Sequence, residues 1–196
     1  MGYTTLRGGS GGPSTSGYGP VPDIFSRHLD TNGDGSGTTN AIGDYSASAE
    51  TFYCQPAAGS IFRVTRMLVL IRAPSAKFYT DNYGSRDPLA NGVVVRKQDD
   101  SGTLIDLTNA HPVQRNGEWG QFAFDAELYP SALGNNDSYL RVRWTFEKHG
   151  YPIRLVGDNN ERIEVVLNDD FSLNTGTSDP LDEHFFVIQG YIENTT

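Results

Sequence analysis

The sequence contains a single cysteine, Cys54, among its 196 residues. One cysteine cannot form a disulfide within the chain or a cysteine-based zinc site. Because Cys54 follows the apolar residues Phe52 and Tyr53, we expect a buried thiol and not a nucleophile. The four histidines are too scattered in the sequence to suggest a metal site: His28, His111, His149 and His184.

Basic residues are also few, with 15 Lys and Arg against 24 Asp and Glu, and the formal net charge is −9. Nucleic-acid binding requires a basic surface, so this composition argues against a nucleic-acid partner. No apolar run is long enough to span a membrane, and Met1 is followed by polar residues and not by a signal segment. We therefore expect a soluble protein, made in a cytoplasm, without a membrane partner.

The sequence lacks the common catalytic motifs, including a G-x-S-x-G elbow and a phosphate-cradling glycine loop that opens a helix. Acidic residues gather late in the chain, at Asp169, Asp170, Asp179, Asp182 and Glu183. Paired carboxylates can cleave glycosides, but acids that begin or end strands are far commoner than catalytic ones. We expect no enzymatic activity.

The most regular pattern in the chain is the alternation between Asp137 and Lys148. Apolar residues recur at every second position, which predicts a strand with one buried and one solvated face. Trp144 brings the largest apolar area to the buried face. With apolar residues from other segments, this face predicts a core of Leu68, Leu70, Leu140, Val142, Trp144, Phe146, Ile163, Val165 and Leu167.

Further strands are predicted at 51–55, 61–72, 77–79, 93–97, 104–107, 121–125, 153–155, 162–167 and 183–192, with a hairpin turn at 100–102. A short helical turn is expected at 126–133. Many short strands between turn residues, with little helical periodicity, predict an all-β protein. The fold class is therefore an antiparallel β-sandwich, jelly-roll-like, formed by residues 30–196.

Residues 1–29 are expected to form an extended Gly-rich arm. The arm has too little apolar surface to fold alone, so we expect it to lie along another protein. The residues expected to contact that partner are Tyr3, Leu6, Arg7, Tyr18, Val21, Ile24, Phe25 and Arg27. The alternative is an ordinary frayed terminus.

A partial calcium motif begins at Asp30, where Asp30, Asn32 and Asp34 alternate and Gly35 stands sixth, as in an EF-hand loop. The acid expected at the twelfth position is replaced by Ala41, although Asp44 could substitute from a differently shaped loop. The alternative is a run of Asn-Gly and Asp-Gly turns without metal. Calcium is the one cofactor that the sequence suggests.

Three segments together resemble virion structural proteins of tailed bacteriophages: Asp30-Thr31-Asn32-Gly33-Asp34-Gly35, Arg143-Trp144-Thr145-Phe146, and the stretch from Asn168-Asp169-Asp170 to Val187-Ile188-Gln189-Gly190-Tyr191. The resemblance implies a capsid decoration (cement) protein with a jelly-roll body. Such a protein is made in the host cytoplasm, sits on the capsid surface as a trimer or dimer, and braces the major capsid protein. No catalytic residues come with it.

Three alternatives remain open at this point. A tail adaptor or fibre-base protein would share the strands, the arm and the charge. A carbohydrate-binding sandwich would use exposed aromatic residues, for which Tyr79, Tyr83 and Trp119 are candidates. A jelly-roll glycosidase would place two acids on one concave face.

Overall fold

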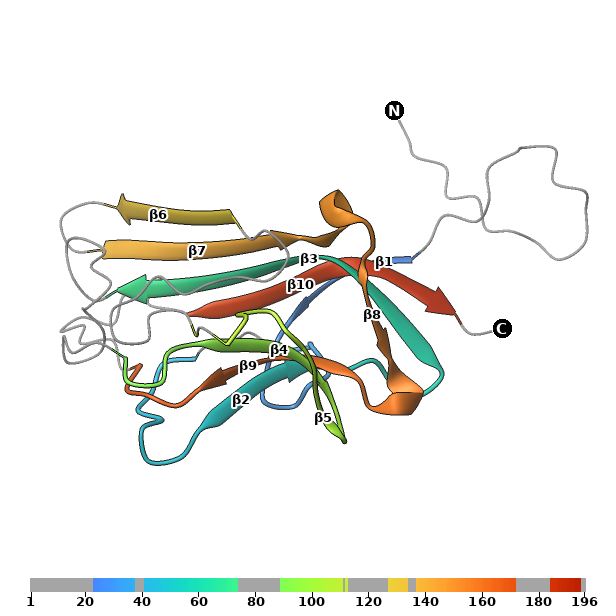
Figure 1. Ribbon diagram of the computed structural model, residues 1–196, viewed down its shortest axis with the longest axis horizontal. Helices are drawn as coiled ribbons and strands as arrows, with labels where there is room; N and C mark the ends of the chain where they lie inside the picture. Colours follow the sequence, from blue (N-terminus) through green and yellow to red (C-terminus); the bar gives the residue numbers. More distant parts are fainter. Residues whose placement is uncertain are drawn as a thin grey trace, which may run out of the picture.

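The computed structural model describes residues 23–37, 41–73, 89–110, 112, 127–133, 137–171 and 184–194. These ranges contain ten β-strands and two short 3-10 helices, so the protein is all-β, as predicted (Figure 1). The elements are β1 (Asp23–His28), β2 (Glu50–Cys54), β3 (Ser60–Ala73), β4 (Val94–Asp99), β5 (Gly102–Asp106), β6 (Glu127–Leu133), β7 (Asp137–Thr145), η1 (Phe146–His149), β8 (Ile153–Val156), η2 (Gly157–Asn159), β9 (Arg162–Leu167) and β10 (Phe185–Asn194). In the described part of the chain, neither helix has the length or hydropathy needed to cross a bilayer.

The strands form two antiparallel sheets that lie one above the other (Figure 1). The large sheet has the order β1-β10-β3-β7-β6, and β8 also pairs with β3. The small sheet has the order β2-β9-β4-β5. The pairing is nested, because β1 pairs with β10, β2 with β9, β3 with β7 and β8, and β4 with β5.

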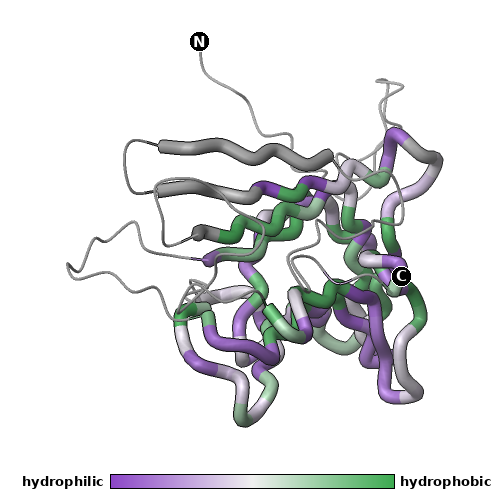
Figure 2. Tube along the Cα trace, turned by 60° about the vertical axis from the view of Figure 1, so that its left-hand side comes forward, coloured by the Kyte–Doolittle hydropathy of each residue, from purple (hydrophilic) through white to green (hydrophobic). Residues whose placement is uncertain are grey.

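The core lies between the two sheets and is built from alternate residues of their strands. Trp144 and Val142 on β7 are fully buried, as are Ile163, Val165 and Leu167 on β9. These five core predictions are confirmed, and so is that of Phe146, which is 2% exposed. Figure 2 shows hydrophobic stretches along the strands and hydrophilic ones along the outer turns.

The core prediction was wrong for one residue of β3. Met67, Val69 and Ile71 face the core, so Leu68 lies on the outer side of the sheet and is only partly buried. Leu70 is buried, at 6% exposed, but it shares the outer side with Leu68. Both faces of this strand are apolar in sequence, and alternation then gives no signal for which face turns inward. The side chain of Leu140 lies outside the described residues.

The helical turn expected at 126–133 was also wrong, because residues 127–133 form strand β6 at an edge of the large sheet. The segment contains Pro130, which lacks an N–H and is tolerated in a sheet at an edge. Pairing with β7 along the whole of β6 outweighs the weak local preference. The hairpin predicted at 100–102 is present and joins β4 to β5.

Residues 23–28, expected in the arm, form strand β1 and pair with β10 in the large sheet. Phe25 is 8% exposed, and its ring centroid lies 4.5 Å from that of Phe62. Phe25 therefore packs in this protein's own core and does not fill a partner's pocket, in contrast to the prediction. Residues 1–22, with Tyr3, Leu6, Arg7, Tyr18 and Val21, lie outside the described residues.

Candidate functional site

The outer face of the large sheet carries a group of arginines around an apolar floor. Strand register places Arg143 on β7, Leu68 on β3 and Val187 on β10 directly opposite one another. Arg141 lies two residues before Arg143 on the same strand, and Arg66 lies two residues before Leu68. Because residues two apart in a strand share a face, all five side chains project away from the core.

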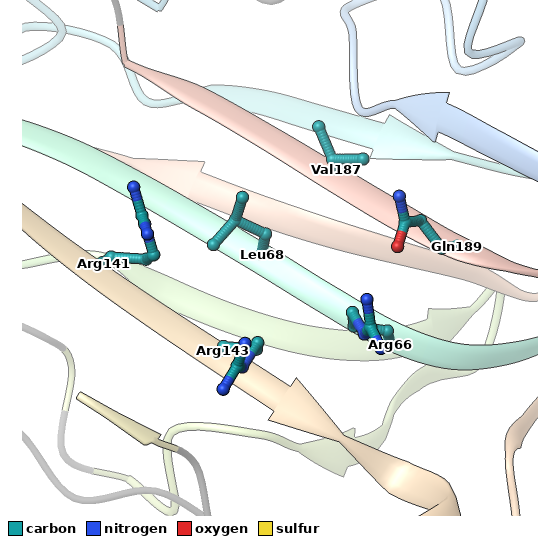
Figure 3. A pocket seen from close by; sticks show the side chains of 6 residues that line it. All are labelled: Arg66, Leu68, Arg141, Arg143, Val187 and Gln189. Carbon is teal, nitrogen blue, oxygen red and sulfur yellow. The ribbon is translucent and has the colours of Figure 1, made fainter. Parts of the chain in front are cut away.

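These side chains and Gln189 line a hollow of about 350 Å³. Figure 3 shows them on one side of β7, β3 and β10, with Leu68 between the arginines. Leu68 and Val187 are partly buried, and they form the apolar part of the lining. We call the surface formed by Arg66, Leu68, Arg141, Arg143, Val187 and Gln189 the arginine face.

The arginine face concentrates positive charge on a chain whose net charge is −9. Among the described residues, no carboxylate forms an ion pair with Arg66 or Arg141. Other arginines of the fold do have such partners: Arg63 pairs with Glu193, and both Arg96 and Arg162 pair with Glu164. Guanidinium groups without a carboxylate partner in the described part of the chain can donate their N–H groups to an external anion.

A second hollow of about 500 Å³ adjoins the first. It is also lined by Arg66 and Gln189, and it continues to Ile24, Phe25 and Ser26 on β1. Ile24 is 84% exposed, which is unusual for a large apolar side chain in a strand. The two hollows form one track across the sheet, cationic at the β7 end and apolar at the β1 end.

A bulge in β3 shapes this track. In β10 the partner of Gln189 is Arg66, but the partner of Gly190 is Val64, so Thr65 is an extra residue. The Thr65 hydroxyl donates a hydrogen bond of 3.2 Å to the carbonyl oxygen of Gln189. Bulges bend a strand and redirect its side chains, which explains why the second hollow opens here.

Gly190 keeps the strands close at the bulge. A Cβ atom at this position would lie 1.9 Å from the carbonyl oxygen of Arg63, a distance that no real contact allows. Only glycine permits the close approach of the two backbones. Gly190 also lines the second hollow.

The predicted calcium loop is organised by hydrogen bonds to its own backbone. Asp30 is 7% exposed. Its Oδ1 accepts from the N–H groups of Asn32 and Gly33, and its Oδ2 accepts from that of Gly37 at 3.1 Å. Asp34 Oδ1 accepts from the Ser36 N–H at 2.8 Å, and hydrogen bonds from Ser36 lower the pKa of Asp34.

Turn chemistry therefore accounts for the acidic residues of this loop, because both Asp30 oxygens already accept from the backbone. Ala41 is fully buried and offers no oxygen side chain. Nowhere in the described ranges do three or more His, Cys, Asp or Glu residues gather closely enough to hold a metal. Calcium at Asp30, Asn32 and Asp34 stays a prediction, which calorimetry at millimolar calcium tests directly.

Asp169, considered as a catalytic acid, serves as an acceptor for the turn before β4. Its carboxylate accepts from the N–H groups of Ala90 at 2.9 Å, Asn91 at 3.0 Å and Gly92 at 2.8 Å. The residue is 6% exposed, so these hydrogen bonds occupy a carboxylate largely shielded from solvent. Asp179, Asp182 and Glu183 lie outside the described residues.

Cys54 is fully buried on β2, as predicted. Burial, with a smaller effect of the nearby negative charge of Asp30, raises the pKa of the Cys54 thiol to about 12. A thiol with so high a pKa has almost no thiolate at neutral pH, so it is a poor nucleophile. The candidate glycan-binding aromatics Tyr79, Tyr83 and Trp119 lie outside the described residues.

The arginine face was not predicted from the sequence, although part of the signal was present. Alternation already placed Arg141 and Arg143 together on the solvated side of their strand. Arg66 and Leu68 come from a segment far away in the sequence, and only the pairing of β3 with β7 brings them alongside. No protein-family model, curated protein or solved structure matches this chain.

Proposed function

We propose that this protein is a non-enzymatic structural component of a tailed-phage particle, a capsid decoration protein that binds the major capsid protein. The observation that carries the binding role is the arginine face, where Arg66 and Arg141 have no carboxylate partner among the described residues. A surface that only needed to be soluble would gain nothing from gathering like charges around Leu68 and Val187. A surface that docks to an acidic partner would gain from gathering these charges, because they are complementary to the charges of the partner.

The strand order supports a jelly-roll body for this protein. A jelly roll is a long antiparallel hairpin rolled into two sheets, so its first strand pairs with its last and its second with its second last. The pairing of β1 with β10, β2 with β9 and β4 with β5 follows that scheme. Jelly rolls recur in viral capsid and lectin domains, which is compatible with a particle component.

The Gly-rich arm adds a second contact with the capsid. Its glycines let the backbone lie close to a strand edge of the partner, while Tyr3, Leu6, Tyr18 and Val21 fill apolar depressions and Arg7 meets an acid. The exposed Ile24 continues this line of contacts onto β1. On the capsid surface we expect the chain to act as a trimer or dimer.

Tailed-phage particles purified from the source of the chain test this proposal. We expect mass spectrometry to detect the chain in the particles, and cryo-electron microscopy to place it on the outer capsid lattice. A position at the tail would replace the decoration role with that of an adaptor or fibre-base protein. Its absence from purified particles would overturn the proposal.

Deletion of residues 1–22 tests the arm separately. The described strands begin at Asp23, so the truncated protein should keep its fold and its melting temperature. We expect it to bind capsids much more weakly than the full chain does. Full occupancy of capsids by the truncated protein would show that docking depends on the sandwich alone.

A further inference from the structure

We propose that the arginine face holds an extended acidic segment of the partner protein, in which two carboxylates flank one apolar side chain at alternate positions. The pattern is acid, any residue, apolar, any residue, acid. This inference deepens the proposed function by naming the chemistry of the partner.

Charge selects an anion. Arg66 and Arg141 have no ion-pair partner among the described residues, and Arg143 lies between them in the register. A guanidinium presents several N–H donors in a plane and binds a carboxylate through two parallel hydrogen bonds. The rest of this acidic chain would repel an acidic partner, so the arginine face is where attraction outweighs that repulsion.

Register sets the spacing of the anions. Arg141 lies opposite Leu70, and Arg66 lies four residues from Leu70 along β3. Four residues of a strand span about 13–14 Å, so the two guanidinium groups arise roughly that far apart along the sheet. Residues i and i+4 of an extended peptide have the same separation and point the same way, so they can face Arg141 and Arg66 together.

The apolar floor selects the residue between the two acids. Leu68 and Val187 lie in the register row midway between the rows of Arg141 and Arg66, together with Arg143. Residue i+2 of the partner would therefore point at Leu68 and Val187. Covering the side chains of Leu68 and Val187 is favourable only for an apolar residue. A polar residue would lose its hydration there without gaining a hydrogen-bond partner.

The net charge of the chain disfavours a nucleic acid as the occupant. A polynucleotide would bring its charges against a chain with a net charge of −9. A short acidic polypeptide places its few charges where the arginines are.

The track continues past the second acid. Because Arg66 and Gln189 line both hollows, a segment with its second acid at Arg66 would extend toward Ile24 on β1. Ile24 is 84% exposed and would be covered by an apolar residue at i+6. This position adds a contact that a shorter segment lacks.

Peptide binding to the full chain tests the inference, with fluorescence anisotropy as the readout. The probe is a labelled peptide with aspartate, serine, leucine, serine and aspartate between glycine flanks. The control peptide has the same composition in the order serine, aspartate, leucine, aspartate, serine. Its acids point away from its leucine in an extended chain, so we expect binding at least about tenfold weaker than that of the probe. Equal affinity for the two peptides would overturn the register argument.

Variants of the protein locate the site. We expect the double variant Arg66→Gln, Arg141→Gln to bind the probe at least about tenfold more weakly. The matched control is Arg154→Gln, because Arg154 is an exposed arginine on β8 that lines neither hollow. It removes the same kind of charge and should change affinity by less than about twofold. Because the double variant removes two positive charges and Arg154→Gln removes one, a loss of binding free energy in the double variant no larger than twice that of Arg154→Gln would reduce the effect to net charge and overturn the site.

Extending the probe by serine and leucine tests the second hollow. We expect Ile24→Ser to weaken binding of the longer peptide and to leave the shorter one unchanged. A single-stranded oligonucleotide or an anionic polysaccharide serves as competitor, and displacement of the probe at similar affinity would overturn the assignment to a polypeptide.

Particle binding separates this inference from the proposed function. If the double variant still decorates capsids while the probe fails to bind the unaltered chain, the acidic-segment inference falls and the decoration role stands. If the probe binds as expected and capsids do not bind the chain, the decoration role falls and the site stands.

Discussion

Two groups of arginines, one on the outer face of each sheet, differ in their charged partners. On the small sheet, Glu164 is 1% exposed and accepts hydrogen bonds from Arg96 on β4 and Arg162 on β9. On the large sheet, Arg66 and Arg141 are exposed and form no ion pair with a described carboxylate. The first arrangement uses its charges internally to hold strands together, and the second keeps donors for a partner.

The difference arises from cross-strand neighbours and not from arginine content. In the small sheet, register places Arg96 directly opposite Glu164, so the opposite charges meet within the sheet. In the large sheet, register places Arg141 opposite Leu70 and Tyr129, and it places Arg66 opposite Thr145 and Gln189, so neither arginine has an acid directly opposite. Arg143 differs from them, because it lies opposite Glu127 on β6. Cross-strand pairing therefore decides whether an arginine stabilises the fold or remains available for binding.

The largest effect should come from the core that both faces share. Trp144 is fully buried between Arg143 and Thr145, whose side chains point outward. Trp144→Ala should lower the free energy of unfolding by about 3–5 kcal/mol, the usual cost of truncating a buried large aromatic. Urea denaturation measures it, with Tyr151→Ala as the control because Tyr151 is 88% exposed. A cost below about 1 kcal/mol for Trp144→Ala would contradict the packing described here.

The second-largest effect on stability is expected from the ion pairs of the small sheet, which join Glu164 to Arg96 and Arg162. Glu164→Gln keeps the size of the side chain but leaves Arg96 and Arg162 without their shared negative partner. Their side chains are 32% and 21% exposed, so water offsets part of the loss. We expect a destabilisation of about 2 kcal/mol, below the value for a fully buried pair. Chemical denaturation at neutral pH measures this loss of unfolding free energy. A loss for Glu164→Gln no larger than that for Arg141→Gln would contradict the contrast between the two groups of arginines.

A smaller effect of opposite sign is expected on the large sheet. The double variant Arg66→Gln, Arg141→Gln removes like charges that repel each other and lack carboxylate partners among the described residues. Its unfolding free energy should be unchanged or higher by about 0.5 kcal/mol at low salt. The gain should vanish at high salt, where screening removes the repulsion. A destabilisation above about 1 kcal/mol would show that these arginines hold the fold together.

The smallest effect concerns an arginine of the large sheet that does have a partner. Arg63 Nε donates to Glu193 Oε2 at 2.6 Å, and this hydrogen bond lowers the pKa of Glu193 below its ordinary value of 4.5. A depressed pKa adds stability above pH 4.5, and that stability is lost as pH falls through the lower, folded-state value. The stability difference between the unaltered chain and Glu193→Gln should therefore shrink in acid. Thermal melts at about pH 6 and about pH 3 measure it, and a constant difference would exclude the ion pair as its cause.

Local sequence predicted the elements whose two faces differ strongly. The alternation around Trp144 identified β7 and its buried side, and the Asp100-Ser101-Gly102 turn identified the β4–β5 hairpin. It failed where the local signal was balanced or weak. Leu68 was assigned to the wrong side of β3 because both sides are apolar, and β6 was mistaken for a helical turn because its pairing partner was not known.

The role of a single side chain was likewise predicted where it depends on neighbours in the sequence, and missed where it depends on distant residues. Sequence reasoning expected Cys54 to be buried, because its apolar neighbours are adjacent in the chain. It could not find the role of Asp169, whose carboxylate binds the backbone of Asn91 and Gly92, far away in the sequence. It placed Phe25 in an arm, because the pairing of β1 with β10 joins two ends of the described chain.

The sequence by itself determined that this protein is all-β, that Trp144 is in the core and that the chain is acidic, because period-two alternation and composition are local or additive properties. Only the tertiary structure decided that Arg66 lies beside Arg141 and Arg143 around Leu68, while Arg96 and Arg162 lie on Glu164. The physical reason is that strand pairing and register are set by the packing of the whole core, and register chooses which distant side chains become neighbours.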